Sequence, residues 1–311
     1  MRAVFGPVAS RRLGLSLGID LVPHKTCNFN CIYCECGPTT NLMAGPGPLR
    51  PASEILPEVA QVLTEQEERL DYITLSGAGE PTLNSDLSAI VEGLKGLTDT
   101  PLAVLTNSTL LHRPEVTAAL EPVDLIMPSL DTAIDSTFQE INRPHPAVKL
   151  ENILTGLYGL KRKLKADVWL EILLVAGFND SPQEVEALVE AVGAIDPDRV
   201  QLNTVDRPPP EPGILPVAFE RLEEIASLFG AKGEVIARPL SLFKPAAHKA
   251  LAEDVLSLID RRPCTRQDLK VALGRSDDEI AAVLKVLMVK GRVRQERLGD
   301  NVFLRGIIEK G

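Results

Sequence analysis

Short apolar runs alternate with longer amphipathic stretches over most of this chain. The apolar runs are Leu15–Leu21, Tyr72–Leu75, Leu102–Leu105, Leu125–Met127, Val168–Val175 and Val200–Asn203. The helical patterns are Ser53–Leu70, Ser85–Leu97, Lys149–Lys165, Ser181–Val192 and Val217–Phe229. Strands that alternate with helices form right-handed βαβ units around a parallel sheet. Six strands are two fewer than a closed eight-stranded barrel has, so the pattern predicts an α/β fold, an open partial (β/α)6 barrel with its functional groups at the carboxyl ends of the strands.

The composition and charge limit the class of protein. The chain has 311 residues, of which 44% are hydrophobic and only 4% aromatic, so we expect an aliphatic core. The formal net charge of −10 argues against a protein that coats nucleic acid indiscriminately. No apolar run approaches the roughly 18 residues of a membrane span, and the first residues lack the apolar stretch of a signal peptide. We therefore expect a cytoplasmic protein with no membrane partner and with reduced thiols.

The C-terminal part follows a different pattern. It has three predicted helices and then two predicted strands around a Leu298-Gly299-Asp300 turn: His248–Ile259, Thr265–Leu273, Ser276–Val289, Arg292–Glu296 and Asn301–Leu304. Three helices followed by a hairpin are the layout of a winged helix-turn-helix. Residues 245–311 carry 13 basic and 10 acidic residues, although the whole chain is acidic. These features predict two domains, a barrel over residues 1–240 and a winged helix-turn-helix domain over residues 241–311.

Four of the five cysteines lie within ten residues: Cys27, Cys31, Cys34 and Cys36. An odd total that is clustered in this way is a poor disulfide framework and a good sign of a metal site. Three close thiolates after the first strand suit a 4Fe–4S cluster that leaves one iron open to a small molecule. The alternative is structural zinc, which usually needs four protein ligands and would require a second cysteine pair, whereas only Cys264 remains downstream.

The spacing Cys27-x3-Cys31-x2-Cys34, with Tyr33 before the last cysteine, resembles the signature of the radical S-adenosylmethionine (SAM) superfamily. Ser76-Gly77-Ala78-Gly79-Glu80-Pro81 resembles its glycine-glycine-glutamate motif, with Ala78 in place of the first glycine of the pair. The resemblance implies that Cys27, Cys31 and Cys34 bind one 4Fe–4S cluster. It also implies that SAM is cleaved reductively to a 5′-deoxyadenosyl radical, with a reductase or flavodoxin-type protein as electron donor. Tyr33 would then lie against the adenine, and Gly79 and Glu80 would hold the methionine amine.

Other segments are similar to a branch of the superfamily related to the tRNA wybutosine-synthesis enzymes. They are Phe5–Gly14, Pro23–Cys27, Ser129–Asp131 and Leu202–Pro209. That branch carries a second cluster on additional cysteines near the N-terminus, whereas no cysteine precedes Cys27 here. The resemblance therefore implies one cluster and an enzyme that modifies an RNA base, with tRNA as the partner. Radical chemistry on a peptide or small molecule stays open as the alternative, with the winged domain as substrate holder or dimer contact.

Four polar residues follow predicted strands and become candidate cofactor contacts: Asn107, Ser108, Asp131 and Asn203. Asn107 and Ser108 suit a ribose contact or, equally, a polar loop. Asp131 and Asn203 lie on the same predicted rim, where contact with the cofactor competes with turn or capping roles. Glu171 sits in the middle of a strand, and a buried carboxylate is costly unless it is paired. We expect it to line the barrel lumen rather than an exposed edge.

The third helix of the C-terminal part begins Ser276-Asp277-Asp278-Glu279. Carboxylates at that position repel phosphate, so sequence-specific DNA binding is not expected, and neither is a cluster-bearing transcription regulator. The basic residues gather instead in two sets, Arg261, Arg262 and Arg266, and Lys290, Arg292, Arg294 and Arg297. They predict a surface that holds an RNA backbone or docks a protein.

Overall fold

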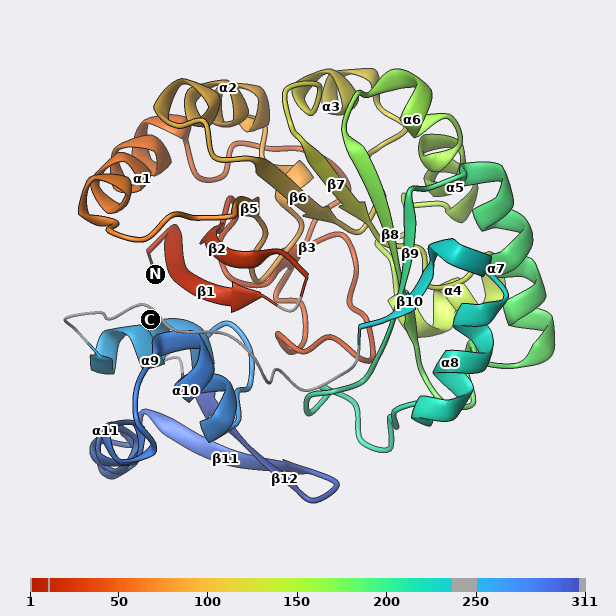
Figure 1. Ribbon diagram of the computed structural model, residues 1–311. Helices are drawn as coiled ribbons and strands as arrows, with labels where there is room; N and C mark the ends of the chain where they lie inside the picture. The colour runs from red at the N-terminus through yellow and green to blue at the C-terminus, as the bar shows by residue number, and fades with distance from the viewer. Residues whose placement is uncertain (1, 11, 237–250, 308–311) are drawn as a thin grey trace.

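The computed structural model describes residues 2–10, 12–236 and 251–307 (Figure 1). Its centre is one curved sheet of eight strands. Across the sheet these are β1 (Val4–Ser10), β2 (Gly14–Ile19), β5 (Tyr72–Leu75), β6 (Leu102–Thr106), β7 (Leu125–Pro128), β8 (Asp167–Leu174), β9 (Arg199–Thr204) and β10 (Gly233–Val235). From β2 across the sheet to β10, every neighbouring pair of strands is parallel. The strand order is linear, so the sheet is open, and the prediction of an α/β partial barrel is confirmed.

The sheet has two more strands than we predicted. Strand β1 pairs antiparallel with β2, and β10 adds a seventh parallel strand beside β9. Gly6-Pro7 interrupts the apolar alternation of β1, and the pairing with β2 shifts register between Phe5 and Val8. Strand β10 has only three residues, all half-buried. Neither strand therefore has the apolar periodicity by which a strand is recognised in a sequence.

The helices lie mainly along the outer side of the curved sheet (Figure 1). They are α1 (Ala52–Glu65), α2 (Leu87–Leu97), α3 (Pro114–Ala119), α4 (Asp135–Asn142), α5 (Leu150–Leu157), α6 (Leu160–Lys163), α7 (Pro182–Ile195) and α8 (Phe219–Ser227). The predicted helix Lys149–Lys165 is two helices, because Gly159 adopts a left-handed conformation with φ of 78° between α5 and α6. Apolar side chains of the strands and helices, such as Leu17, Ile73 and Ile90, form one buried core.

Residues 251–307, the C-terminal module, have the predicted three helices and hairpin. These are α9 (Leu251–Ile259), α10 (Arg266–Leu273), α11 (Asp277–Val289), β11 (Val293–Leu298) and β12 (Asn301–Gly306). Val255, Leu269 and Ile280 belong to a second buried core within the module. The predicted domain boundary at residues 240–241 and the start of the predicted helix His248–Ile259 lie outside the described residues.

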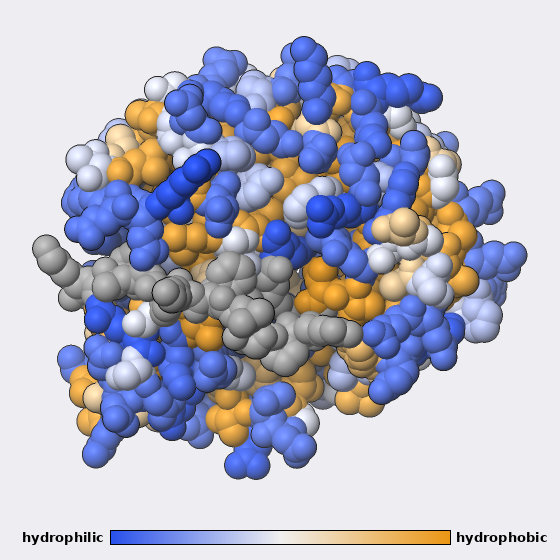
Figure 2. Space-filling view, viewed as in Figure 1, coloured by the Kyte–Doolittle hydropathy of each residue, from blue (hydrophilic) through white to orange (hydrophobic). Residues whose placement is uncertain are grey.

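Polar and charged residues cover most of the face in Figure 2, over the barrel helices and over the C-terminal module. In the part of the chain that the structure describes, no helix combines the length and apolar character of a membrane-spanning segment.

The C-terminal module packs on β1 through α9 and α10. Arg261, which we expected on a basic surface, is instead buried at this contact. Its guanidinium stacks 4.2 Å from the Phe5 ring centroid, donates to the Arg2 carbonyl at 3.0 Å, and lies 3.6 Å from the Asp20 carboxylate. Because the guanidinium is directed inward against the barrel, this side chain is unavailable to RNA.

The Asp20 carboxylate is expected to make the stability of the protein depend on pH. Burial raises the pKa of Asp20 from 3.8 to about 6, although Arg261 and Arg50 act to lower it. The folded state therefore binds this proton more tightly than the unfolded state. As the pH rises from 3.8 to about 6, the contribution of Asp20 to the free energy of unfolding falls. Asp20→Asn resembles the protonated form, so it should raise the free energy of unfolding by roughly 2–3 kcal/mol at about pH 7.5 and change it little near pH 4.

Urea unfolding across a pH series measures this difference. Asp99→Asn is the control, because Asp99 is an exposed loop residue. An Asp20→Asn effect of the same size at both ends of the series would contradict the assignment.

Candidate functional site

The cysteine segment follows β2 and crosses the carboxyl ends of the parallel strands. Its first cysteine belongs to β3 (Thr26–Cys27), which pairs with β4 (Asn41–Leu42) and closes the segment into a loop. The amide of Lys25 donates to the Ala78 carbonyl at 2.7 Å, and the amide of Glu80 donates to the Thr26 carbonyl at 3.1 Å. These two bonds hold Cys27 directly beside the 76–81 segment, so the two predicted motifs form one site.

Each of the three predicted ligands is contacted by a nitrogen donor. Cys27 Sγ accepts from Asn107 Nδ2 at 3.5 Å, Cys31 Sγ from Asn142 Nδ2 at 3.6 Å, and Cys34 Sγ from Lys25 Nζ at 3.1 Å. Hydrogen bonds to ligand sulfurs stabilise thiolates and tune the potential of an iron–sulfur cluster. The donor set therefore fits such a cluster.

The protonation of these thiols differs within the loop. Burial raises the pKa of Cys27 to about 12 and raises that of Cys31 further. A hydrogen bond from Cys36, assisted by Lys25, lowers the pKa of Cys34 to about 5. Metal binding requires thiolates, which burial disfavours at Cys27 and Cys31. The positive charge of bound iron would stabilise the thiolate form of both residues.

Within the described residues, no three His, Cys, Asp or Glu side chains converge on a point that would hold a single metal ion. A 4Fe–4S cube binds each thiolate through a different iron, so its ligands do not have to converge in this way.

Glycine is required at position 79 by the close approach of β3. A Cβ atom on Gly79 would lie 2.1 Å from the Thr26 carbonyl oxygen. Gly77 has a φ of 142°, and a Cβ there would lie 2.0 Å from Asp20 Oδ1. The 76–81 segment thus needs glycine because its backbone packs directly against the segment that leads to the cysteines.

Glu80 is buried and its carboxylate binds the protein itself. One oxygen accepts from the Thr82 amide at 3.0 Å, from the Thr82 hydroxyl at 2.6 Å and from the Thr106 hydroxyl at 2.7 Å. The other oxygen accepts from the Asn107 amide at 2.7 Å. Burial nevertheless raises the pKa of Glu80. The side chain therefore joins the ends of β5 and β6.

Tyr33 and Asp131 meet in one cluster with Asn142, a residue that we did not predict as part of the site. The Tyr33 hydroxyl donates to Asp131 Oδ2, and Asn142 Nδ2 donates to both the Tyr33 oxygen at 2.8 Å and Asp131 Oδ2 at 3.1 Å. The Leu173 amide donates to Asp131 Oδ1 at 2.9 Å. Asn142 ends the helix α4, which has no strong sequence signal, and only its position before Arg143-Pro144 marks it as the start of a loop.

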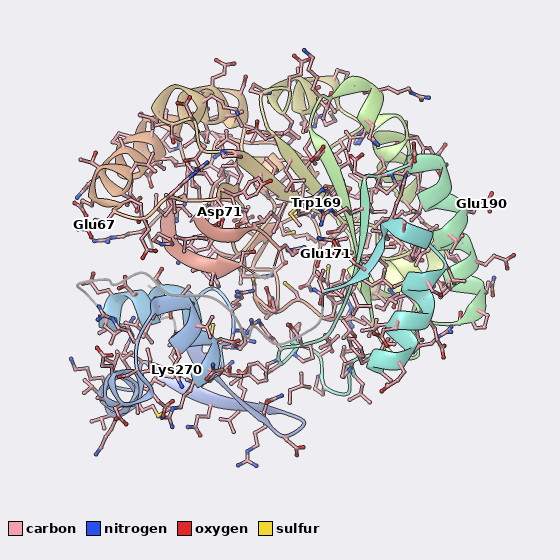
Figure 3. All side chains as sticks on the ribbon, viewed as in Figure 1. Glu67, Asp71, Trp169, Glu171, Glu190 and Lys270 are labelled. Atoms are coloured by element: carbon pink, nitrogen blue, oxygen red, sulfur yellow. The ribbon has the colours of Figure 1, made fainter. Side chains whose placement is uncertain are left out.

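A cavity of about 200 Å³ lies beside this cluster and reaches the second cysteine. Its polar lining includes Cys31, Tyr33, Asn107, Asp131, Asn142 and Glu171, and Phe29, Phe138 and Leu150 supply part of the apolar wall. Glu171 thus lies in the lumen, as we expected, and Figure 3 marks its place on the sheet. The cavity combines aromatic and apolar surface with a few polar groups, which is typical of a small-molecule site.

The remaining two predicted residues lie at the edge of this site. Asn203 Nδ2 donates to Glu171 Oε1 at 3.0 Å, while Arg12 Nη1 donates to Glu171 Oε2 at 2.6 Å. Ser108 is buried with a φ of 70°, and its hydroxyl donates to the Ser129 carbonyl at 2.7 Å. Neither Asn203 nor Ser108 is among the residues that line the cavity. Ser108 ties the end of β6 to the end of β7, whereas its neighbour Asn107 faces the cavity and Cys27.

Comparison with known proteins shows the family to which the chain belongs. Residues 21–192 match the radical SAM superfamily. A UPF0026 protein of Helicobacter pylori is 30% identical over 96% of this chain and 96% of its own length. A protein named GTPase Obg from Brachyspira hyodysenteriae is 35% identical over 95% of this chain, but the chain spans only 44% of that longer protein. The chain belongs to the radical SAM superfamily and, within it, to the UPF0026 proteins.

A solved structure shows the same fold. A radical SAM methyltransferase from Sphaerobacter thermophilus superposes with a TM-score of 0.55 and 20% identity, over 72% of this chain and 66% of its own. Members of the superfamily are enzymes that use a 4Fe–4S cluster and SAM, so this chain is an enzyme with these cofactors. Cys27, Cys31 and Cys34 would hold the cluster, and the adjoining cavity and the 76–80 backbone would hold SAM.

Proposed function

We propose that this enzyme modifies an RNA base, with tRNA as the substrate class, and that the C-terminal module is a winged helix that holds the RNA backbone. The observation that carries the proposal is a set of exposed cations on that module. Lys285, Lys290 and Arg297 are exposed and make no ion pair within the described residues, whereas Arg266 and Arg294 pair with Asp277 and Glu296. Unpaired cations are the ones free to neutralise phosphate.

Two relatives with shorter matches support a nucleotide substrate. A protein named dual-specificity RNA methyltransferase RlmN from Phenylobacterium zucineum is 27% identical over 57% of this chain. A probable GTP 3′,8-cyclase from Methanothermobacter marburgensis is 29% identical over 54%. The wybutosine-like branch remains our proposal for the place of this chain among RNA-modifying enzymes.

The residues of this chain bind and orient the cofactors and the substrate, and they exclude water. The cofactors supply a 5′-deoxyadenosyl radical when bound. Tyr33, held by Asp131 and Asn142, presents a fixed aromatic face at the cavity for the adenine. Asn107 and Glu171 supply donors and acceptors for the ribose or the substrate. Enzymes of this superfamily need an electron donor, and we assign that role to a reductase or flavodoxin-type protein in the cytoplasm, where the ligand thiols stay reduced.

We propose a single cluster. Cys36 lies beside Cys34, and Cys264 is 4% exposed in the core of the C-terminal module, where its backbone pairs with Leu304. Neither position provides a separate set of ligands, so chemistry that requires a second cluster is not part of the proposal.

Binding of tRNA across a salt series tests the proposal. Replacing Lys285, Lys290 and Arg297 together with Ala should weaken tRNA binding by roughly 1–3 kcal/mol. A plot of the logarithm of the binding constant against the logarithm of the salt concentration should become less steep, by about one unit of slope for each phosphate that is no longer neutralised. The control is Arg294→Ala, because Glu296 already pairs with that charge at 2.8 Å. Formation of 5′-deoxyadenosine without substrate should be unchanged in both variants, since the module contacts the cysteine loop through other residues, Arg262 and Arg305. Absence of tRNA binding by the wild type at low salt would favour the peptide or small-molecule alternative.

A further inference from the structure

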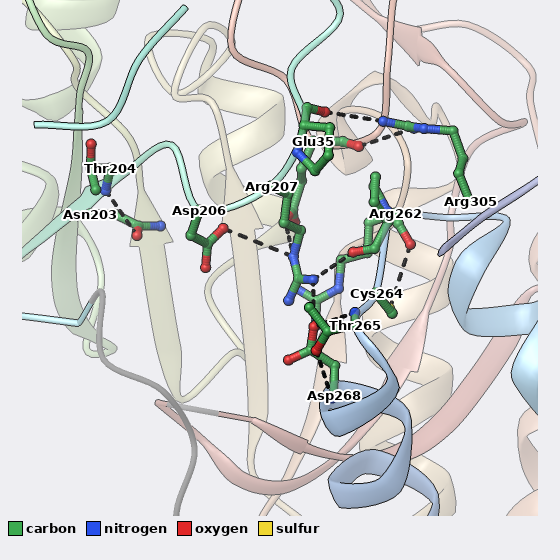
Figure 4. Close-up of polar contacts among 12 residues, drawn as sticks. Glu35, Asn203, Thr204, Asp206, Arg207, Arg262, Cys264, Thr265, Asp268 and Arg305 are labelled. Carbon is green, nitrogen blue, oxygen red and sulfur yellow. Dashed lines mark hydrogen bonds and ion pairs between the residues drawn. The ribbon is translucent and has the colours of Figure 1, made fainter. Parts of the chain in front are cut away.

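The C-terminal module contacts the cysteine loop itself, at the residue between Cys34 and Cys36. Glu35 is approached by three arginines, Arg207 from the segment after β9, and Arg262 and Arg305 from the C-terminal module (Figure 4). Arg207 Nε lies 2.8 Å from Glu35 Oε2, and Arg262 Nη1 lies 3.4 Å from Glu35 Oε1. Arg305 Nη1 donates to the Glu35 backbone carbonyl at 3.3 Å. Both the side chain and the backbone of Glu35 are therefore held.

Arg207 joins the barrel, the loop and the module at one buried point. Its side chain is only 6% exposed. Besides Glu35, its Nη1 lies 3.0 Å from Asp268 Oδ2 and donates to the Pro263 carbonyl at 2.5 Å. The buried guanidinium thus has carboxylate partners in both the cysteine loop and the C-terminal module, which favours the arrangement with both partners in place.

Arg305 is itself fixed before it reaches the loop. Its Nε is shared between the two carboxylate oxygens of Glu296 at 3.1 and 3.0 Å, across the hairpin of β11 and β12. Its Nη2 donates to the Pro208 carbonyl at 3.1 Å. Because the guanidinium is planar and has several fixed donors, these contacts leave its Nη1 pointing at the Glu35 carbonyl.

The cysteine loop is anchored to the barrel before Glu35, where the Ile32 amide donates to the Ile141 carbonyl at 2.9 Å. The backbone hydrogen bonds of the described residues around Glu35 itself are short-range. The Cys34 amide donates to the Cys31 carbonyl at 3.2 Å, and the Gly37 amide donates to the Cys34 carbonyl at 2.9 Å. Such turns do not by themselves position the part of the loop that follows Ile32. The three arginines add long-range contacts at this point, since each lies more than 170 residues away in the chain.

We propose that Glu35 is a positioning residue for the iron–sulfur cluster, and that the C-terminal module, through Arg262 and Arg305, forms part of the cluster site. The module then has a function at the cysteines that does not depend on which substrate the enzyme takes. It holds the segment that carries the third ligand, Cys34, and it sets the charge next to the cluster.

Cluster retention and cluster potential in the reconstituted full chain test this proposal. Glu35 and Arg262 have side chains that are 38% and 41% exposed, so Glu35→Gln and Arg262→Gln should fold. Both variants should lose iron to a chelator about three to ten times faster than the wild type, followed by the decay of cluster absorbance. The double variant should be no faster than the quicker single variant, because both changes break the same contact.

The midpoint potential of the cluster distinguishes the effects of the two charges. Removing the negative charge of Glu35 should raise the potential, and removing the positive charge of Arg262 should lower it. The matched control is Arg266→Gln, whose arginine is in the same module and pairs with Asp277 instead. The proposal is overturned if the two variants lose iron no faster than the control. It is overturned as well if their melting temperature is lowered to the same extent as that of the control and this decrease alone accounts for the iron loss. It is also overturned if both potentials shift in the same direction.

Discussion

Replacing any one of Cys27, Cys31 and Cys34 with Ala is expected to abolish cluster binding and formation of 5′-deoxyadenosine together. Anaerobic reconstitution of the wild type should give about four irons per chain with the absorption of a 4Fe–4S cluster. Each of the three sulfurs receives a hydrogen bond from the protein, and a cube that loses one of its three protein ligands has no replacement at that iron. Iron analysis, absorption spectra and chromatography of the cleavage products measure the effect.

Cys36→Ala and Cys264→Ala are the matched controls and should keep both the cluster and the cleavage activity. Cys264 lies in the core of the C-terminal module, and Cys36 is outside the three-cysteine motif. A wild type that holds about eight irons would refute the single cluster. Loss of the cluster in Cys36→Ala would show that the ligand set is wrong.

Gly79→Ala is expected to remove most of the cluster and to destabilise the barrel. The new Cβ would lie 2.1 Å from the Thr26 carbonyl oxygen, in a backbone that cannot rotate away as a side chain can. Relief requires β3 to move away from the 76–81 segment, which breaks the hydrogen bond from the Glu80 amide to Thr26 and shifts Cys27. We expect a loss of roughly 3 kcal/mol or more in the free energy of unfolding.

The control is Gly193→Ala in α7, where the new methyl group meets nothing within 4 Å. That change should stabilise the helix by roughly 0.5–1 kcal/mol and leave iron binding unchanged, because Ala is the better helix former. Chemical unfolding together with iron content measures both variants. If Gly79→Ala binds the full complement of iron with wild-type stability, the close packing of the two motifs is not required.

The contacts of the C-terminal module change how its positive charge is interpreted. Of the seven arginines and lysines that we considered for an RNA surface, Arg261 is buried against Asp20, Arg262 holds Glu35, and Arg266 and Arg294 pair with acidic neighbours. The net charge of a segment counts these residues equally, whereas a cation that is buried or paired with a carboxylate attracts phosphate less than an unpaired, exposed one. The module thus has two kinds of basic residue, those that contact Glu35 in the cysteine loop and those that are exposed without an ion pair among the described residues.

Several properties of this protein follow from its sequence alone. The alternation of apolar and amphipathic stretches predicts six of the seven parallel strands, because helix and strand periodicity is local. The predicted ligand set of the cluster is likewise local, since Cys27, Cys31 and Cys34 lie within one short loop. The three helices and the hairpin of the C-terminal module follow from the same kind of pattern.

Only the tertiary structure decided which distant residues meet. It brings Asn142 to Tyr33 and Asp131, turns the Glu80 carboxylate toward Thr106 and Asn107, and places Arg305 on Glu35, 270 residues away. It also adds β1 and β10, whose sequences lack a strand pattern but whose neighbours supply open sheet edges. Long-range pairing depends on the free energy of burying and satisfying groups across the whole fold, and no spacing within a short segment encodes that.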